Sequence, residues 1–190
     1  NVSKPVVAVF LGEKPDHYEG NVYLAHTMEE TARIAVDLAM GRPVQKNYCQ
    51  PIDSPVEEIL PADKTVKGLY SGGTLAAEAG MLISEALGLG GLIKKEGYIL
   101  QAQGYEVIDL GDDIYTQGKP HPMIDPEVRQ KKIREYAKDP DTGVILLDCV
   151  LGYGCHPDMA QALAPVIRES IALAEAEGRK LYFVASVCGT

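Results

Sequence analysis

Short apolar runs alternate with stretches of helical pattern along most of this chain. The apolar runs, rich in β-branched residues, predict strands that are largely buried. They cover residues 4–11, 22–24, 66–70, 106–110, 144–150 and 181–187. Between them, helical spacing of apolar residues or helix-capping residues predict helices at residues 28–40, 74–87, 126–138 and 159–177. Strands that alternate with helices predict a parallel sheet with right-handed crossovers.

Residues at the expected helix ends support these predictions. Thr27 and Glu30 have the spacing of a capping box before the first helix. Asp125 followed by Pro126 is typical of a helix start. Pro165 falls inside the last helix, and we expect it to bend or split that helix because proline lacks the N–H of the helical hydrogen bond.

The regular pattern breaks between residues 42 and 64, where four prolines lie among mixed polar residues. We therefore predict the end of one α/β domain at residues 1–45, a linker at 46–63 and a second domain at 64–190. We expect the second domain to be a flavodoxin-like or Rossmann-like doubly wound parallel sheet. Because the chain opens in one apolar strand and closes directly after another, we expect it to be a piece of a longer protein.

Composition narrows the range of partners. The 190 residues carry a formal net charge of −9 without a basic cluster, so we expect no nucleic acid and no membrane as partner. No apolar run reaches the roughly 18 residues of a membrane-spanning helix. Four cysteines without CxxC spacing, and no signal peptide, indicate reduced thiols and a cytoplasmic location.

The first candidate site is the segment Ser71-Gly72-Gly73-Thr74, between a predicted strand and a predicted helix. The free amides of a helix N-terminus carry partial positive charge, and glycine lets an anion approach them. The hydroxyls of Ser71 and Thr74 would add donors. We predict a phosphate or carboxylate site here, and the alternative is a tight strand-to-helix turn. The segment matches neither the Walker P-loop nor the dinucleotide-binding pattern.

The second candidate site follows the most apolar strand. Gly152 and Gly154 lie between that strand and the last helix, and His156 is a candidate anion ligand or acid–base group. The alternative is a flexible loop with a solvated histidine. A metal site that uses Cys155, His156 and Cys188 is not favoured, because nothing fixes their spacing.

The third candidate site is the loop at residues 111–126. We expect Asp112 and Asp113 to close the preceding strand. The loop holds Lys119, which we expect to pair with an anionic substrate, and His121, and its prolines would order the loop before binding. The alternative is a rigid surface loop that leads to a capped helix. All three loops follow the carboxyl ends of strands, where open α/β sheets bind their ligands.

Three segments in order, GLYSGGTLAAEA, HPMIDPEVR and LDCVLGYGCHPD, resemble the FdrA family of acyl-CoA-synthetase-like proteins. This family is related to the succinyl-CoA synthetase alpha subunit. The resemblance covers most of residues 64–190, and KPVVAVFLG fits the preceding domain. It implies two CoA-ligase-like domains, the second incomplete here, and a helix start at YSGGTLAAEA that cradles a phosphate.

The chain departs from the ligases in one catalytic feature. The ligases pass phosphate through a histidine in a Gly-His-Ala-Gly setting, and no such motif occurs here. The four histidines, none of which lies in that setting, are His17, His26, His121 and His156. The Rossmann domain that holds CoA in the ligases is also missing from this sequence, so CoA binding cannot be assigned to particular residues here, and the cofactor stays open between CoA and none.

FdrA-like proteins are associated with purine and allantoin breakdown, where carbamoyl transfer involving oxamate has been attributed to the group. The resemblance therefore implies an enzyme subunit for a small anionic substrate of the acyl or carbamoyl phosphate type. We expect it to work in a homo-oligomer or a multi-subunit complex, with His156 or His121 moving the proton.

Two other functions stay open. A non-catalytic assembly or regulatory module that kept the ligase fold would explain the missing phosphohistidine, whereas the retained turn at Ser71–Thr74 favours a working site. A flavodoxin-like domain that binds a flavin ranks last, because no pair of aromatic residues is placed to flank the flavin ring.

Overall fold

The computed structural model describes residues 3–12, 20–45, 63–90 and 92–189. These residues fall into two compact units, residues 3–45 and residues 63–189, and each is described by itself. Cys49, His17 and all but the last residue of the predicted linker at 46–63 lie outside the described residues. Among the helices described, none is long and apolar enough to span a membrane.

The first unit consists of two parallel strands and one helix, namely β1 (Val6–Val9), β2 (Val22–Ala25) and α1 (Met28–Ala39). β1 is half-buried rather than buried as predicted, since the described part of this unit supplies a single helix to cover two strands. Thr27 caps α1 by accepting the Glu30 N–H at 3.1 Å. The Glu30 carboxylate accepts from the His26 N–H at 2.7 Å, whereas a capping box would use the Thr27 N–H.

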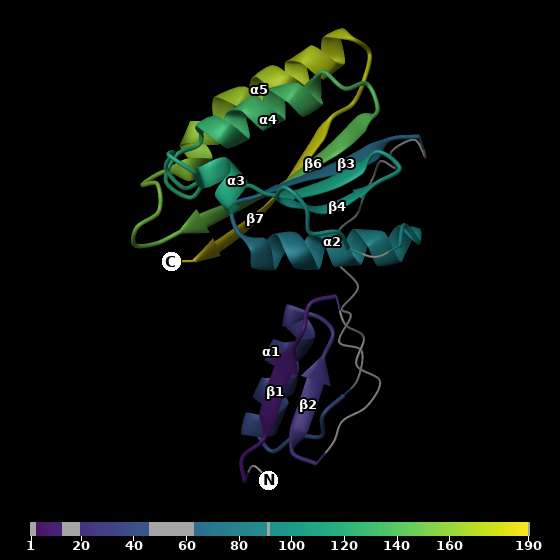
Figure 1. Ribbon diagram of the computed structural model, residues 1–190, viewed down its shortest axis with the longest axis vertical. Helices are drawn as coiled ribbons and strands as arrows, with labels where there is room; N and C mark the ends of the chain where they lie inside the picture. Colours follow the sequence, from purple (N-terminus) through teal and green to yellow (C-terminus); the bar gives the residue numbers. More distant parts are fainter. Residues whose placement is uncertain (1–2, 13–19, 46–62, 91, 190) are drawn as a thin grey trace. The chain divides into compact units, whose positions relative to one another are not determined.

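The second unit is a five-stranded α/β sheet in the order β4-β5-β3-β6-β7. Its strands are β3 (Thr65–Tyr70), β4 (Tyr98–Ala102), β5 (Tyr105–Asp109), β6 (Thr142–Leu151) and β7 (Tyr182–Gly189). Its helices are α2 (Gly73–Leu87), α3 (Asp113–Thr116), α4 (Glu127–Ala137) and α5 (Met159–Ala176). Strands β5, β3, β6 and β7 run parallel, which confirms the predicted mostly parallel α/β fold. Helix α2 covers one face of the sheet, and α4 and α5 lie together on the other (Figure 1).

Strand β4 is absent from the sequence predictions, and it runs antiparallel to β5. The two strands are joined by Gln103 and Gly104, which both have positive φ, at 50° and 84°. Two consecutive residues of this conformation form the tight turn typical of a β-hairpin. Asn-Gly or Asp-Gly would have signalled this turn in the sequence, whereas glutamine at the first position does not.

Replacing Gly104 with alanine is expected to destabilise the second unit by about 1–3 kcal/mol. Gly104 has φ +84°, and a Cβ there would meet Thr65 Cγ2 at 3.0 Å. Gln103→Gly is the matched control, because it relieves a positive φ at the neighbouring position. Urea unfolding of both variants tests this. Equal losses of unfolding free energy in the two variants would contradict it.

Helix α5 runs through Pro165 as one continuous helix, so the proline does not split it (Figure 1). Leu163 and Val166, on either side of the proline, are buried in the core between the sheet and the α4–α5 pair. Burial of these side chains outweighs the hydrogen bond that proline cannot donate. Cys149 lies in the same cluster.

Candidate functional site

Three loops with predicted site residues follow the carboxyl ends of neighbouring parallel strands of the second unit. The turn at residues 71–74 follows β3, the loop at 110–126 follows β5, and the loop at 152–158 follows β6. The last two loops are hydrogen-bonded to each other, because the His156 N–H donates to the Met123 carbonyl oxygen at 2.8 Å. The structure thus places the predicted loops at the edge where α/β sheets bind ligands.

The start of α2 has no side-chain cap. Its N-cap is Gly72, in an extended conformation, and the first turn carries no acidic residue. The Ala76 N–H makes a hydrogen bond to Gly72 O at 3.2 Å, so the three amides before it, from Gly73 to Leu75, have no partner within the helix. By contrast, α5 is capped by Asp158, whose side chain accepts from the Gln161 N–H at 2.9 Å.

The Ser71 hydroxyl points into the interior rather than toward the start of α2. Ser71 is 1% exposed, and its Oγ donates to Asp148 Oδ2 at 2.7 Å. Its backbone N–H also donates to the Asp148 carboxylate, at 3.0 Å to Oδ1. The structure therefore differs from the prediction that this hydroxyl donates to a bound anion. Thr74, in contrast, is exposed in the first turn of the helix.

A buried ion pair beneath this edge joins two of the three loops. Arg129 on α4 is 0% exposed and Asp148 on β6 is 1% exposed, and Arg129 Nη1 lies 3.1 Å from Asp148 Oδ1. The same guanidinium donates through Nη1 to the Asp148 carbonyl and through Nη2 to the Pro122 carbonyl, the latter at 2.8 Å. Burial lowers the pKa of Arg129, and the Asp148 carboxylate opposes that shift. Through Asp148 and Ser71, one guanidinium thus holds the turn before α2 and the loop of His121.

Neither member of this ion pair was among the predicted site residues. Arg129 lies in an ordinary helical segment, and Asp148 lies in the most apolar strand. Asp148 itself could have indicated the ion pair in the sequence, because a charged residue inside a buried strand needs a buried partner.

Asp109 is a third residue that the sequence analysis did not single out. It lies between two of the predicted site residues, His121 and Gly73. Its Oδ1 accepts the Gly111 N–H at 2.8 Å. A Cβ on Gly111 would lie 2.8 Å from His121 Nε2 and 3.0 Å from Asp109 Oδ1, and a Cβ on Gly73 would lie 2.9 Å from Asp109 Oδ2. The Asp109 carboxylate therefore lies between the His121 ring and the start of α2, and both glycines are needed for this close approach.

Replacing Asp109 with asparagine is expected to stabilise the protein at neutral pH. Burial raises the pKa of Asp109 above its ordinary value of 3.8, and the hydrogen bond from Gly111 opposes that rise. The folded state then binds this proton more tightly than the unfolded state, so stability falls as pH rises from below 3.8 through the raised folded value. Asparagine keeps the acceptor for Gly111 and removes the titration.

Thermal unfolding of wild type and Asp109→Asn as a function of pH measures this effect. The stability difference in favour of the variant is expected to grow as pH rises through that window and then to stay constant. A difference that is independent of pH, or that favours the wild type at pH 7, would contradict the assignment.

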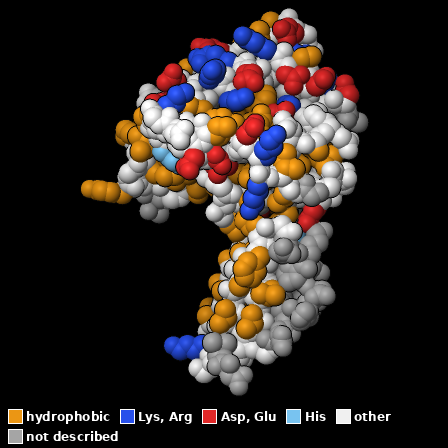
Figure 2. Space-filling model, in the orientation of Figure 1, with side chains coloured by type: hydrophobic (Ala, Val, Ile, Leu, Met, Phe, Trp, Pro, Cys, Tyr) orange, Lys and Arg blue, Asp and Glu red, His pale blue; other side chains and the backbone are white. Residues whose placement is uncertain are grey.

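Asp112, Asp113 and Lys119 lie on exposed parts of the same edge. Strand β5 ends at Asp109, so Asp112 and Asp113 do not close it; Asp112 instead caps α3, accepting the Ile114 N–H at 3.0 Å. Lys119 is exposed, and its role toward an anion stays a prediction. Figure 2 shows a histidine side chain at the surface of the second unit, beside acidic side chains.

Gly152 and Gly154 have positive φ, at 129° and 85°, and a Cβ on Gly154 would meet nothing within 4 Å. The positive φ favours glycine at both positions, and at Gly154 no crowding by neighbours contributes. His156 is half-buried directly after them. Among the described residues, no group of three or more His, Cys, Asp or Glu side chains is arranged to hold a metal ion.

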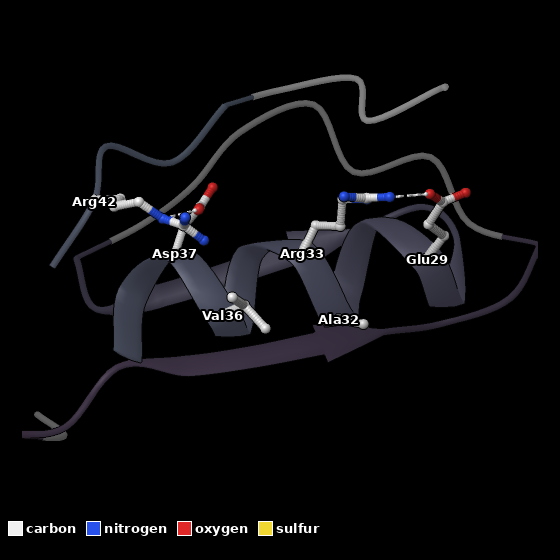
Figure 3. A pocket seen from close by; sticks show the side chains of 6 residues that line it. All are labelled: Glu29, Ala32, Arg33, Val36, Asp37 and Arg42. Atoms are coloured by element: carbon white, nitrogen blue, oxygen red, sulfur yellow. Dashed lines mark hydrogen bonds and ion pairs between the residues drawn. The ribbon is translucent and has the colours of Figure 1, made fainter. Parts of the chain in front are cut away.

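The first unit has a separate hollow of about 300 Å³ on α1, which contains none of the predicted site residues. Its two arginines are already paired: Arg33 lies 3.1 Å from Glu29, and Arg42 lies 2.9 Å from Asp37 (Figure 3). This hollow therefore offers an anion fewer free donor groups than the carboxyl edge of the second unit, the edge of the sheet at the carboxyl ends of its parallel strands.

Comparison with known proteins gives two matches that bear on this site. The family described as CoA-ligase matches residues 69–190. A curated relative from Escherichia coli (strain K12), named "Uncharacterized protein YahF", is 38% identical over 201 aligned residues. The alignment covers 98% of this chain and 38% of the relative, so the chain spans well under half of that protein's length.

Proposed function

Because this chain belongs to the CoA-ligase family, we propose that its second unit binds a small phosphorylated or carboxylate substrate at the carboxyl edge of its sheet, as part of an enzyme. The observation that carries this proposal is the start of α2, which has no side-chain cap and no acidic residue in its first turn. A helix start of this kind presents amide donors and partial positive charge to an anion. Asp109 and His121 lie beside it, and the Asp109 carboxylate would supply acid–base chemistry there.

The amides of Gly73, Thr74 and Leu75 would stabilise negative charge that develops on the substrate. One well-placed donor of this kind is worth about 3 kcal/mol in the barrier, or on the order of a hundredfold in rate. Ser71 contributes through the backbone turn that Asp148 holds, since its hydroxyl is engaged in the interior. His121 lies close to this turn, and His156 is joined to the His121 loop by its backbone.

We propose carbamoyl transfer as the specific reaction, on the strength of the FdrA-like segments. In such a reaction the acceptor's nucleophile forms a bond to the carbamoyl carbon, and the bond from that carbon to the phosphate oxygen breaks. The departing phosphate would stay on the α2 amides. Transfer of this kind requires no phosphohistidine. The enzyme would work as a homo-oligomer or multi-subunit complex, with CoA or no cofactor.

A non-catalytic assembly module is the second candidate function. The two functions differ in what they expect of the carboxyl edge, since a module that serves only assembly has no need of a ligand there.

A thermal-shift titration with carbamoyl phosphate, CoA and plain phosphate tests the proposal. A ligand present at one hundred times its dissociation constant stabilises the folded state by about 2.7 kcal/mol, which is readily measured. A shift with carbamoyl phosphate beyond that with plain phosphate supports the transferase function. A shift with CoA alone would instead support an acyl-CoA ligase, and no shift with any of them would support the assembly module.

A further inference from the structure

The loops of His121 and His156 contain the same local structure. In each, a histidine is followed by a proline, which has no N–H, and then by a residue whose N–H turns back to the histidine ring. The Met123 N–H donates to His121 Nδ1 at 3.2 Å, and the Asp158 N–H donates to His156 Nδ1 at 3.0 Å. The two turns are also joined to each other, by the His156 N–H and the Met123 carbonyl oxygen at 2.8 Å.

These hydrogen bonds determine which ring nitrogen carries the proton. A backbone N–H only donates, so each Nδ1 must accept and must be unprotonated. In a neutral imidazole the proton is then on Nε2, which becomes a donor. Both rings are half-buried at the carboxyl edge. His121 Nε2 lies close to the Ser71 carbonyl oxygen and Asp109 Oδ1, above Gly111.

We propose that His121 and His156 present neutral Nε2–H groups as hydrogen-bond donors to the oxyanion of the substrate, and that neither ring takes a proton from it. This inference rests on the proposed anion site at the start of α2. A preorganised neutral donor stabilises negative charge as an oxyanion hole does, without a change of its own protonation state. Asp109, next to His121, is then the residue of this edge that accepts a proton.

Donation from Nε2 to a bound anion is a role of the two histidines that turn formation alone does not require. If the twin turns served only to order the loops, the same tautomer would be present, but a bound anion would leave the two Nε2 atoms unaffected. The test therefore needs two measurements, the tautomer in the free protein and the response of each ring to an anion.

Nitrogen-15 NMR of the 190-residue chain, labelled at histidine, makes both measurements. At about pH 8.5, well above the usual histidine pKa of about 6.5, correlation of the ring nitrogens with the carbon-bound ring protons identifies the tautomer. His121→Gln and His156→Gln variants assign the signals. We expect a protonated Nε2 and an unprotonated Nδ1 in both rings. A protonated Nδ1 in either ring would overturn the proposal.

Inorganic phosphate is then added, and the two Nε2 signals are expected to shift with a common saturation curve while His26, in the first unit, stays unchanged. If phosphate moves the amides of Gly73 and Thr74 but neither Nε2, the donor role is wrong and the anion site stands. If phosphate moves none of these groups, the proposed function itself fails.

Discussion

Replacing Arg129 with alanine is expected to lower the free energy of unfolding by about 3–5 kcal/mol. The substitution leaves the Asp148 carboxylate buried, at 1% exposure, without its charged partner, and it removes the donor to the Pro122 carbonyl oxygen. Removing one member of a buried ion pair costs far more than removing an exposed one, because the remaining charge has lost its solvation by water. Urea unfolding followed by circular dichroism measures this loss.

Arg134→Ala is the matched control on the same helix. Arg134 pairs with Glu169 at 3.4 Å, but both side chains are more than half exposed, and exposed pairs contribute about 0–1 kcal/mol. Similar losses in the two variants would show that the Arg129–Asp148 pair does not hold this edge together. A third variant, Arg129→Lys, keeps the charge but lacks the forked geometry that reaches Asp148 and Pro122 together, and it should recover part of the loss.

Replacing Gly73 with proline is expected to weaken phosphate binding by at least about tenfold, the effect of losing one hydrogen bond to a charged group. Proline removes the Gly73 N–H at the start of α2. The helix itself should tolerate the change, because proline is favoured at the first helical position and Gly72 already has the extended backbone that precedes proline. Isothermal titration calorimetry with phosphate measures the change in affinity.

Gly73→Ala is the control that separates the lost donor from added bulk. Both substitutions introduce a Cβ that would lie 2.9 Å from Asp109 Oδ2, so both require that carboxylate to move. Only proline removes the amide hydrogen. Binding that weakens equally in the two variants would assign the effect to crowding at Asp109 and would count against the α2 amides as anion ligands.

The sequence predicts the fold well where a strand is central and apolar. The segment predicted at residues 66–70 is β3 (Thr65–Tyr70), and the segment at 144–150 is the longer β6 (Thr142–Leu151). The failures have local causes. Strand β4 was missed because its hairpin turn uses glutamine where asparagine or aspartate is typical. Of the two outcomes predicted for Pro165, a bend or a split of the helix, the split does not occur, because core packing on both sides of the proline outweighs one lost hydrogen bond.

The candidate site was predictable only in part, because the sequence indicates its loops but not the contacts between them. Glycines and histidines after strands mark loops, and the loops at residues 71–74, 111–126 and 152–158 follow the carboxyl ends of their strands as expected. Which side chains meet there depends on tertiary contacts between segments far apart in the chain. Asp148 accepts from Ser71, 77 residues away, and no spacing in the sequence announces that pair. Asp109 was missed likewise, since its closeness to Gly73 follows from the pairing of β3 with β5.

The central claim is that a small anion binds to the amides at the start of α2, and an amide NMR titration tests it most directly. Phosphate is added to the nitrogen-15-labelled protein, and the backbone N–H signals are followed. We predict saturable shifts at Gly73, Thr74 and Leu75, with no comparable change at Gly104, which lies in the β4–β5 turn away from this edge. Unchanged signals at these three residues, or equal shifts over the whole surface, would contradict the claim.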